Sequence, residues 1–178
     1  YVPPPVEFRE VYGATFQQGR NNAFLTNEHF SESVTSAQLT PEAQRDLLLA
    51  SVCIKYTQSN SVGYARNGQM IGVGAGQQSR VDCVKLAGRK VAVWWLRQHP
   101  KVQGLKFKST VKRQERVNAR VRYIEGDFTD AERPIWEANF EEVPEPLTDS
   151  EKTEFLATLD GVALSSDAFF PFRDSLDH

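Results

Sequence analysis

The sequence predicts an α/β fold, because a helix start, a strand hairpin and a glycine-rich helix entry follow one another between residues 40 and 80. Thr40-Pro41 pairs a capping residue with a proline at the first helical position. Asn67-Gly68 is a strong signal for a tight hairpin, since both central residues of a primed turn need positive φ. The glycine-rich run 72–76 then leads to Ser79 and Arg80, where a second helix is expected. The amides at that helix start, beside an arginine, suit an anion or a polarised carbonyl.

The elements outside this stretch follow from apolar spacing and capping signals. Residues 6–30 alternate apolar and polar side chains, which predicts two strands. The helix after Pro41 buries one face, and a later helix is expected to do the same with Thr110 as N-cap and Asn118 at the rim of its apolar face. The residues of these two faces are Ala43, Leu47, Ala50 and Ile54, then Val111, Val117, Val121 and Ile124. A capping box at 148–151 begins one more helix, which leads to a strand at 162–164.

Composition is that of an ordinary globular protein. The chain has 178 residues, of which 40% are hydrophobic, and this length suits about one domain with an appendage. It has neither an apolar run long enough for a membrane span nor a secretory leader, so a cytosolic protein is expected. Cys53 and Cys83 fall in predicted helices and are expected to be buried, reduced thiols. His29, His99 and His178 lack metal-ligand spacing, and His99 before Pro100 marks a helix end, so no zinc is expected.

Charge is distributed unevenly along the chain, although the net charge is only −2. Segment 97–122 has nine basic residues against Glu115, and segment 125–154 has eleven acids against Arg133 and Lys152. One interpretation is two solvated faces that meet each other or a partner subunit. The other is that the basic segment attracts an anion such as a nucleotide phosphate or a folate glutamate. A nucleic-acid function is not expected, because few exposed aromatic residues accompany the basic ones.

Hydroxyl side chains alternate after the first helix, at Thr57, Ser59 and Ser61. In an extended run their oxygens would share one side, with Gln58 and Asn60 on the other. Neutral oxygen ligands suit a weakly bound alkali cation better than zinc or magnesium. Hydroxyls that bond to their own backbone are the alternative.

Three long contiguous motifs in the sequence resemble those of a known family. They are KYTQSNSV at 55–62, GAGQQSR at 74–80 and SSDAFFPFRD at 165–174. With Trp94-Trp95, His99-Pro100 and EEVP at 141–144 in the same order, they resemble the family of bifunctional purine-synthesis enzymes with AICAR transformylase and IMP cyclohydrolase activities. The resemblance covers roughly residues 45–178, and the first 40 match more loosely. Since the chain begins at Tyr1 without a methionine, we expect it to be a piece of a longer protein.

The resemblance implies a three-layer α/β/α unit similar to cytidine deaminase, as the second copy of a duplicated domain. Residues 1–40 would end the preceding transformylase unit and provide a linker. Segments 41–97 and 151–178 would form the second unit, and 98–150 an inserted helical segment. Members are homodimers with sites between subunits. Deaminase chemistry is not expected, because the sequence has neither His-x-Glu nor Pro-Cys-x-x-Cys to hold zinc.

The implied reaction transfers a formyl group from 10-formyltetrahydrofolate to the amine of AICAR, aminoimidazole carboxamide ribonucleotide, in de novo IMP synthesis. By resemblance, Asn60 would position the formyl group and the amine, and Arg80, Tyr12 and Gly13 would contact the nucleotide. The folate pocket would comprise Val81, Asn118, Phe169, Pro171, Phe172 and Asp174. Potassium would be held by Thr57, Ser59, Ser61 and Asp167, with a backbone carbonyl near Ile54.

Two questions remain open from the sequence. The aromatic segment 167–174 suits a flat heterocycle such as a pterin, with Asp174 facing its N–H donors, but it also suits a hydrophobic plug with a capping aspartate. The family's proton-handling lysine-histidine pair lies upstream of the matched region and is absent here, so the isolated chain is expected to be inactive. The alternative function is a non-catalytic module for ligand binding or dimerisation.

Overall fold

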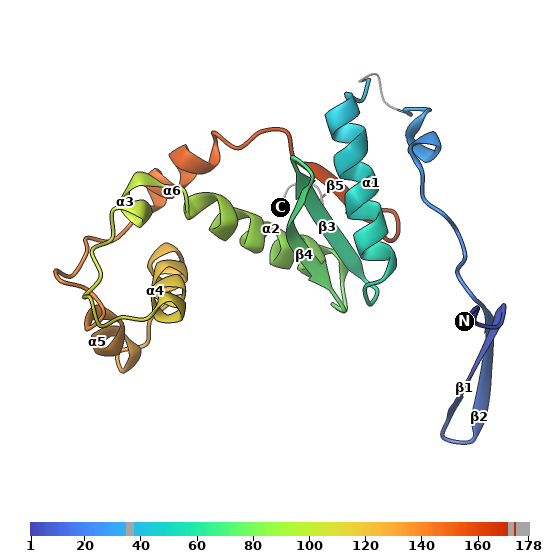
Figure 1. The fold of residues 1–178 in the computed structure, drawn as a ribbon, viewed down its shortest axis with the longest axis horizontal. Coiled ribbons are helices and arrows are strands. Elements are labelled where there is room, and N and C mark those ends of the chain that lie inside the picture. Colours follow the sequence, from blue (N-terminus) through green and yellow to red (C-terminus); the bar gives the residue numbers. More distant parts are fainter. Residues whose placement is uncertain (35–37, 171–172, 174–178) are drawn as a thin grey trace.

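A computed structural model describes residues 1–34, 38–170 and 173, and its centre is a small sheet between two helices (Figure 1). The strands pair antiparallel in the order β4-β3-β5. This sheet unit, as we name it, comprises α1 (Pro41–Lys55), β3 (Ser61–Arg66), β4 (Gln69–Ala75), α2 (Arg80–Leu96) and β5 (Ala163–Ser166). The α/β prediction is confirmed.

Local signals in the sequence account for where the elements of the sheet unit begin and turn. The Thr40 side chain accepts from the Ala43 N–H at 3.2 Å and caps α1. Asn67 and Gly68 turn the β3–β4 hairpin with φ of 52° and 75°. Ser79 caps α2 by accepting from the Asp82 N–H at 3.1 Å. The predicted helix, hairpin and second helix are therefore confirmed.

The two helices cover opposite faces of the sheet at close range. A Cβ placed on Gly63 would lie 2.8 Å from the Ile54 side chain of α1. On the other face, a Cβ at Gly72 or Gly74 would lie only 2.5 or 2.1 Å from a backbone carbonyl oxygen of α2. Glycine at these two positions of the 72–76 run therefore lets α2 approach β4 closely.

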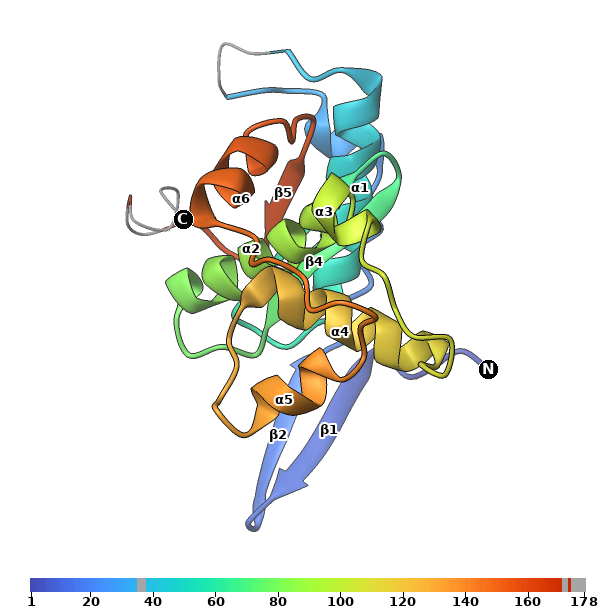
Figure 2. The same cartoon turned by 90° about the vertical axis from the view of Figure 1, so that its left-hand side faces the viewer.

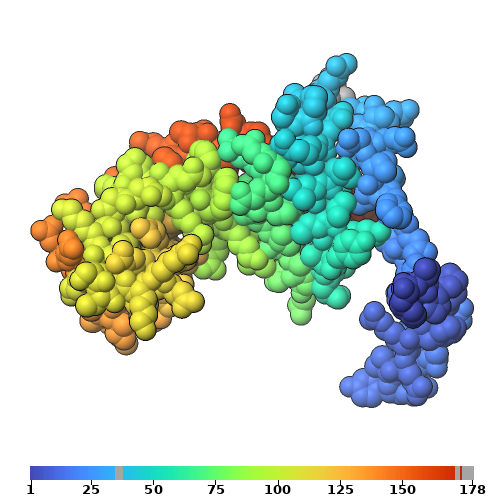
Figure 3. Space-filling view, in the orientation of Figure 1, coloured from blue at the N-terminus to red at the C-terminus, as the bar shows by residue number. Residues whose placement is uncertain are grey.

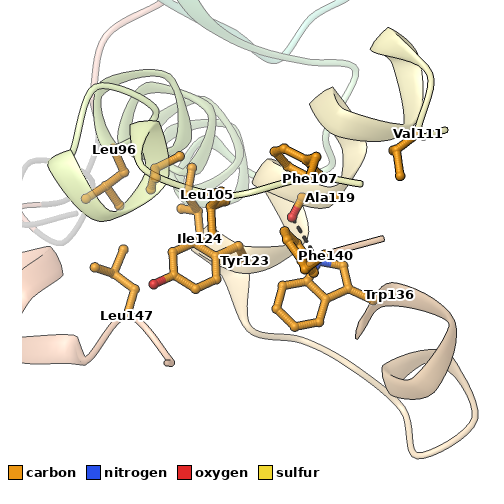
Figure 4. Packing of buried hydrophobic residues seen from close by; sticks show 11 residues of the cluster. Leu96, Leu105, Phe107, Val111, Ala119, Tyr123, Ile124, Trp136, Phe140 and Leu147 are labelled. Atoms are coloured by element: carbon orange, nitrogen blue, oxygen red, sulfur yellow. Dashed lines mark hydrogen bonds between the residues drawn. The ribbon is translucent and has the colours of Figure 1, made fainter. Parts of the chain in front are cut away.

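The segment between α2 and β5 forms a second body with its own core, which we call the insert (Figures 2 and 4). Its helices are α3 (Pro100–Gln103), α4 (Arg113–Glu125), α5 (Glu132–Glu137) and α6 (Asp149–Leu156). Trp136 anchors the core, and its indole N–H donates to the Ala119 carbonyl at 2.9 Å. The rings of Tyr123, Phe128 and Phe140 pack against Trp136, and Phe107 packs against Phe140. This core is separate from the smaller cluster around Val62 in the sheet unit.

One prediction about α4 is wrong, and a second holds only in part. The N-cap is Lys112 rather than Thr110, because Val111 is buried before the helix and the Lys112 N–H donates to the Glu115 carboxylate at 2.7 Å. The predicted apolar face holds at Ile124, which is buried, and in part at Val121, but Val117 is 43% exposed. The buried residues of α4 are Ala119, Tyr123 and Ile124.

Ion pairs join the basic and acidic segments within the insert. Lys101 lies 2.6 Å from Glu151, and Arg122 lies 2.9 Å from Glu132. Thr148 and Glu151 form the predicted capping box at the start of α6. At these two pairs the basic segment 97–122 and the acidic segment 125–154 contact each other, as one of the two interpretations predicted.

The N-terminal region forms a separate hairpin that stands away from the sheet unit (Figure 3). Strands β1 (Val6–Val11) and β2 (Ala14–Gly19) pair in register, which confirms the two predicted strands. Tyr12 and Gly13 form the tip with φ of 51° and 78°. A short 3-10 turn, η1 (Asn27–Phe30), follows before α1.

Cys53 in α1 and Cys83 in α2 are both free thiols, and Cys83 is buried as predicted, whereas Cys53 is only half-buried. His99 follows α2 and accepts from the Lys101 N–H at 3.1 Å, which caps α3 as its position before Pro100 suggests. Across the described ranges, no helix combines the length and apolar character needed to cross a membrane.

Candidate functional site

A cluster of polar side chains lies where β3 begins, α2 begins and β5 ends. Its members are Ser59, Asn60, Ser61, Arg80, Ser166 and Asp167. They are brought together by the sheet, because β5 pairs with β3 and places Ser166 opposite Val62. Residues more than a hundred positions apart therefore share one small site.

Arg80 is the centre of this cluster and its side chain is only 9% exposed. Its Nη1 donates to the Ser61 carbonyl at 3.2 Å, to Ser166 Oγ at 3.1 Å and to the Asp167 carboxylate. Its Nη2 donates to Asn60 Oδ1 at 3.0 Å. Because the guanidinium is planar and bonds in several directions, its orientation is fixed. Arg80 Nε is buried and has no partner among the described residues.

Asn60 is held on both sides of its amide. Its Nδ2 donates to the backbone carbonyls of Gln77 and Gln78 at 3.1 and 3.4 Å, while Oδ1 faces Arg80. Since a guanidinium has donors only, the atom that faces Arg80 must be the amide oxygen. An amide oxygen has two acceptor positions, so Oδ1 retains one for a further donor.

Asp167 supplies the negative charge of the cluster, and its side chain is 20% exposed. The carboxylate accepts from the Ser61 N–H at 2.9 Å, from the Ser59 hydroxyl and from Arg80. Burial raises the pKa of Asp167, but these three hydrogen bonds outweigh it and the net pKa is lowered. Asp167 is therefore ionised at neutral pH.

The residues predicted to hold a cation are only partly arranged as expected. Residues 57–60 do not form an extended run, because the end of α1 closes with Thr57 N–H donating to the Ile54 carbonyl at 3.0 Å. The Thr57 hydroxyl donates to the same carbonyl at 2.8 Å, as the backbone alternative predicted.

Unlike the Thr57 hydroxyl, Ser61 Oγ could serve as a cation ligand. It is buried and has no partner among the described residues. It lies in the cluster beside Asp167, whose carboxylate bonds the Ser61 N–H and the Ser59 hydroxyl. One carboxylate with neutral oxygens is a donor set that fits a weakly bound alkali cation. Arg80 shares the same carboxylate, so a cation there would lie beside the guanidinium.

Other predicted residues lie at various distances along the fold. Val81 follows Arg80 in the first turn of α2 and is half-buried, and Phe169 is 80% exposed after Asp167. Tyr12 and Gly13 form the tip of the separate hairpin, and Asn118 is exposed on α4 of the insert. The structure does not join these last three to the cluster. Pro171, Phe172 and Asp174 lie outside the described residues.

Several members of the cluster were not predicted from the sequence. They are Ser166, the carbonyls of Gln77 and Gln78, and Cys83, whose thiol donates to the Asn60 carbonyl at 2.9 Å. Burial raises the pKa of the Cys83 thiol, so it remains protonated and can donate. The spacing of Arg80 and Cys83, three residues apart on one helix face, was the available signal.

Comparisons with known proteins cover the N-terminal half of the chain. A family model described as AICARFT/IMPCHase bienzyme matches residues 2–90, which include Asn60 and Arg80. The bifunctional purine biosynthesis protein PurH of Paracoccus denitrificans is 39% identical over 87 residues, and that of Mesorhizobium japonicum is 38% identical over the same length. Each alignment covers 49% of this chain and 16% of the relative.

The family model spans half of this chain, and the residues it matches run from the N-terminal hairpin through the first turns of α2. The relatives carry the same bifunctional description as that model. The chain therefore belongs to the AICARFT/IMPCHase bienzyme family.

Proposed function

We propose that this chain supplies the Asn60–Arg80 part of a transformylase site, which transfers a formyl group from 10-formyltetrahydrofolate to the amine of AICAR in purine (IMP) synthesis. The observation that carries the proposal is the hydrogen bond between Arg80 and Asn60 Oδ1, within the residues that the family model matches. The aligned residues cover only 16% of the relative's length, so we assign the activity to the complete protein.

The geometry supports a specific chemical role for Asn60 in the proposed reaction. The amine of AICAR is a weak nucleophile, because its lone pair is drawn into the ring and the carboxamide. Catalysis must orient the amine and remove its proton. With Nδ2 engaged by two carbonyls, the Asn60 side chain offers Oδ1 as an acceptor for an amine N–H. Arg80 polarises that oxygen and provides positive charge for an anionic nucleotide.

The remaining substrate contacts are part of the same proposal. Folate would lie against Val81, Asn118 and Phe169, together with Pro171, Phe172 and Asp174, and Tyr12 and Gly13 would approach the nucleotide. Because the hairpin tip and Asn118 are apart from the cluster in one chain, a homodimer or the rest of the protein would bring them to a site. Potassium at Thr57, Ser59, Ser61 and Asp167 would supply positive charge beside Arg80 when bound.

The sheet order β4-β3-β5, with one helix on each face, supports a cytidine-deaminase-like unit with a helical insert. We place the second such unit of a duplicated domain in residues 41–97 and 151–178, although the end of α6 packs against the core of the insert, and we place the protein in the cytosol. The proposal requires neither zinc nor nucleic acid.

A non-catalytic binding or dimerisation module is the second candidate. It is favoured by one observation, namely that Arg80 bonds to both Asn60 and Asp167, whose other groups also have partners within the chain. Such a network would be sufficient as a structural element without substrate.

Formyl transfer by the complete protein distinguishes the two candidates. In that protein we expect Asn60→Ala to lower kcat at least about tenfold, with a smaller change in KM, because orientation matters most in the transition state. Gln58→Ala, at an exposed amide two residues away, is the matched control. A kcat unchanged by Asn60→Ala, in a protein that formylates AICAR, would remove Asn60 from the site. Binding of both substrates without any turnover would favour the module.

A further inference from the structure

The backbone of Asn60 is anchored by a buried thiol from α2. Cys83 is fully buried, and its Sγ lies 2.9 Å from the Asn60 carbonyl oxygen. The Asn60 N–H donates to the Gln77 carbonyl at 3.4 Å, just before α2. Both backbone polar groups of Asn60 are therefore bonded to residues 77–83, and so is its side-chain Nδ2.

These contacts determine which way the Asn60 amide faces. Arg80 and Cys83 are three residues apart, and they hold the side-chain oxygen and the backbone oxygen of Asn60 respectively. A shift of the Asn60 backbone would change the angle at which Oδ1 meets Arg80 and any incoming donor. Hydrogen-bond strength depends steeply on that angle.

We propose that Cys83 is a positioning residue for Asn60: its thiol fixes the Asn60 backbone so that the free acceptor position of Oδ1 faces the substrate amine. The inference rests on the proposed function of Asn60. Cys83 itself touches no substrate in this arrangement, because it is fully buried beneath the turn.

The chain contains a matched control for this proposal. Cys53 is the other free thiol and it also lies within a helix of the sheet unit, but its side chain makes no hydrogen bond among the described residues. Cys83→Ser keeps a donor of similar size at the Asn60 carbonyl, whereas Cys83→Ala removes it.

The test compares Cys83→Ala, Cys83→Ser and Cys53→Ala in the complete protein. We expect Cys83→Ala to lower kcat for formyl transfer about three- to tenfold, as for the loss of one hydrogen bond, with KM within about twofold. Cys83→Ser should restore most of the loss, and Cys53→Ala should match the parent. An unchanged kcat in Cys83→Ala would overturn the proposal. So would equal losses in the Ala and Ser variants, because that pattern indicates packing alone.

A second readout uses the 178-residue chain and does not depend on activity. The Asn60 side-chain amide, assigned by NMR through its loss in Asn60→Asp, should shift and exchange faster in Cys83→Ala than in Cys83→Ser. An amide signal that is identical in all three cysteine variants would contradict the positioning role. If the complete protein fails to formylate AICAR but this shift appears, the proposed function falls and the anchoring by Cys83 stands.

Discussion

The sheet unit and the insert are stabilised in different ways. The sheet unit packs small residues at close range, since Ala50, Val62, Cys83 and Ala87 are fully buried beside larger residues such as Ile54 and Ile71. The insert packs large rings around Trp136. The close approach of α2 to β4 at Gly72 and Gly74 leaves no room for a side chain there, whereas the insert is filled by large side chains. The comparison indicates that the candidate site depends on backbone spacing and that the insert depends on buried area.

The largest effect is expected from the centre of the insert. Trp136→Ala should destabilise the insert by about 3–5 kcal/mol, because it removes a large buried side chain and the bond to the Ala119 carbonyl. Near-UV circular dichroism and limited proteolysis should show the insert loosened while the sheet unit persists. Ile135→Ala, at an exposed position next to it, is the control. Simultaneous loss of both regions would show that they fold as one body.

The corresponding change in the sheet unit adds atoms instead of removing them. Gly74→Ala should cost about 1–3 kcal/mol, since the new Cβ would meet the Cys83 carbonyl and push α2 from β4. Thermal unfolding measures this loss. Gly19→Ala, where nothing lies within 4 Å of the added carbon, should remain near the parent. A neutral Gly74→Ala would mean that α2 can move without cost, against the dependence on spacing inferred for this region.

A buried carboxylate in the sheet unit should make its stability depend on pH. Asp46 in α1 accepts from the Gly68 N–H at 2.7 Å and from Arg45 Nε at 3.0 Å, and so holds the hairpin turn. Burial raises the pKa of Asp46, but these hydrogen bonds lower it overall. Its contribution is therefore complete above the unfolded pKa and is lost as pH falls through the lower folded value.

Denaturant unfolding between pH 7 and pH 3 tests this contribution. Asp46→Asn should cost about 1–3 kcal/mol at pH 7 and should weaken the acid dependence of stability. Asp149→Asn, at a fully exposed side chain, should leave the pH dependence as in the parent. An Asp46→Asn variant with the parent's acid dependence would refute the assignment.

The sequence predicted turns and helix caps, which depend on neighbouring residues. It did not predict contacts that depend on how distant elements pack. Asn67-Gly68 and Thr40-Pro41 identified their turn and cap, because both signals lie in a few adjacent residues. The hydroxyl alternation after Tyr56 failed, since α1 closes on the Ile54 carbonyl instead of leading into an extended run. The bond between Cys83 and Asn60 joins residues that are 23 positions apart, and in the sequence only the spacing of Arg80 and Cys83 hinted at it. The family resemblance predicted Asn60 and Arg80 as site residues, but only the structure showed that they contact each other.

The smallest effect is expected at the insert surface, where charge contributes little to stability. Glu151 pairs with Lys101 at 2.6 Å and caps α6, and its pKa is lowered to about 2, first by the Lys101 hydrogen bond and then by Thr148. Lys101→Met should therefore raise the pKa of Glu151 towards its ordinary value, as an NMR titration of the carboxyl would show. Glu132 has a pKa of about 2 for the analogous reason, with Arg122 as its partner, and should not change. Because the pair is partly exposed, the melting temperature should hardly move. A large loss of stability in Lys101→Met would mean that the insert depends on charge as well as on its aromatic core.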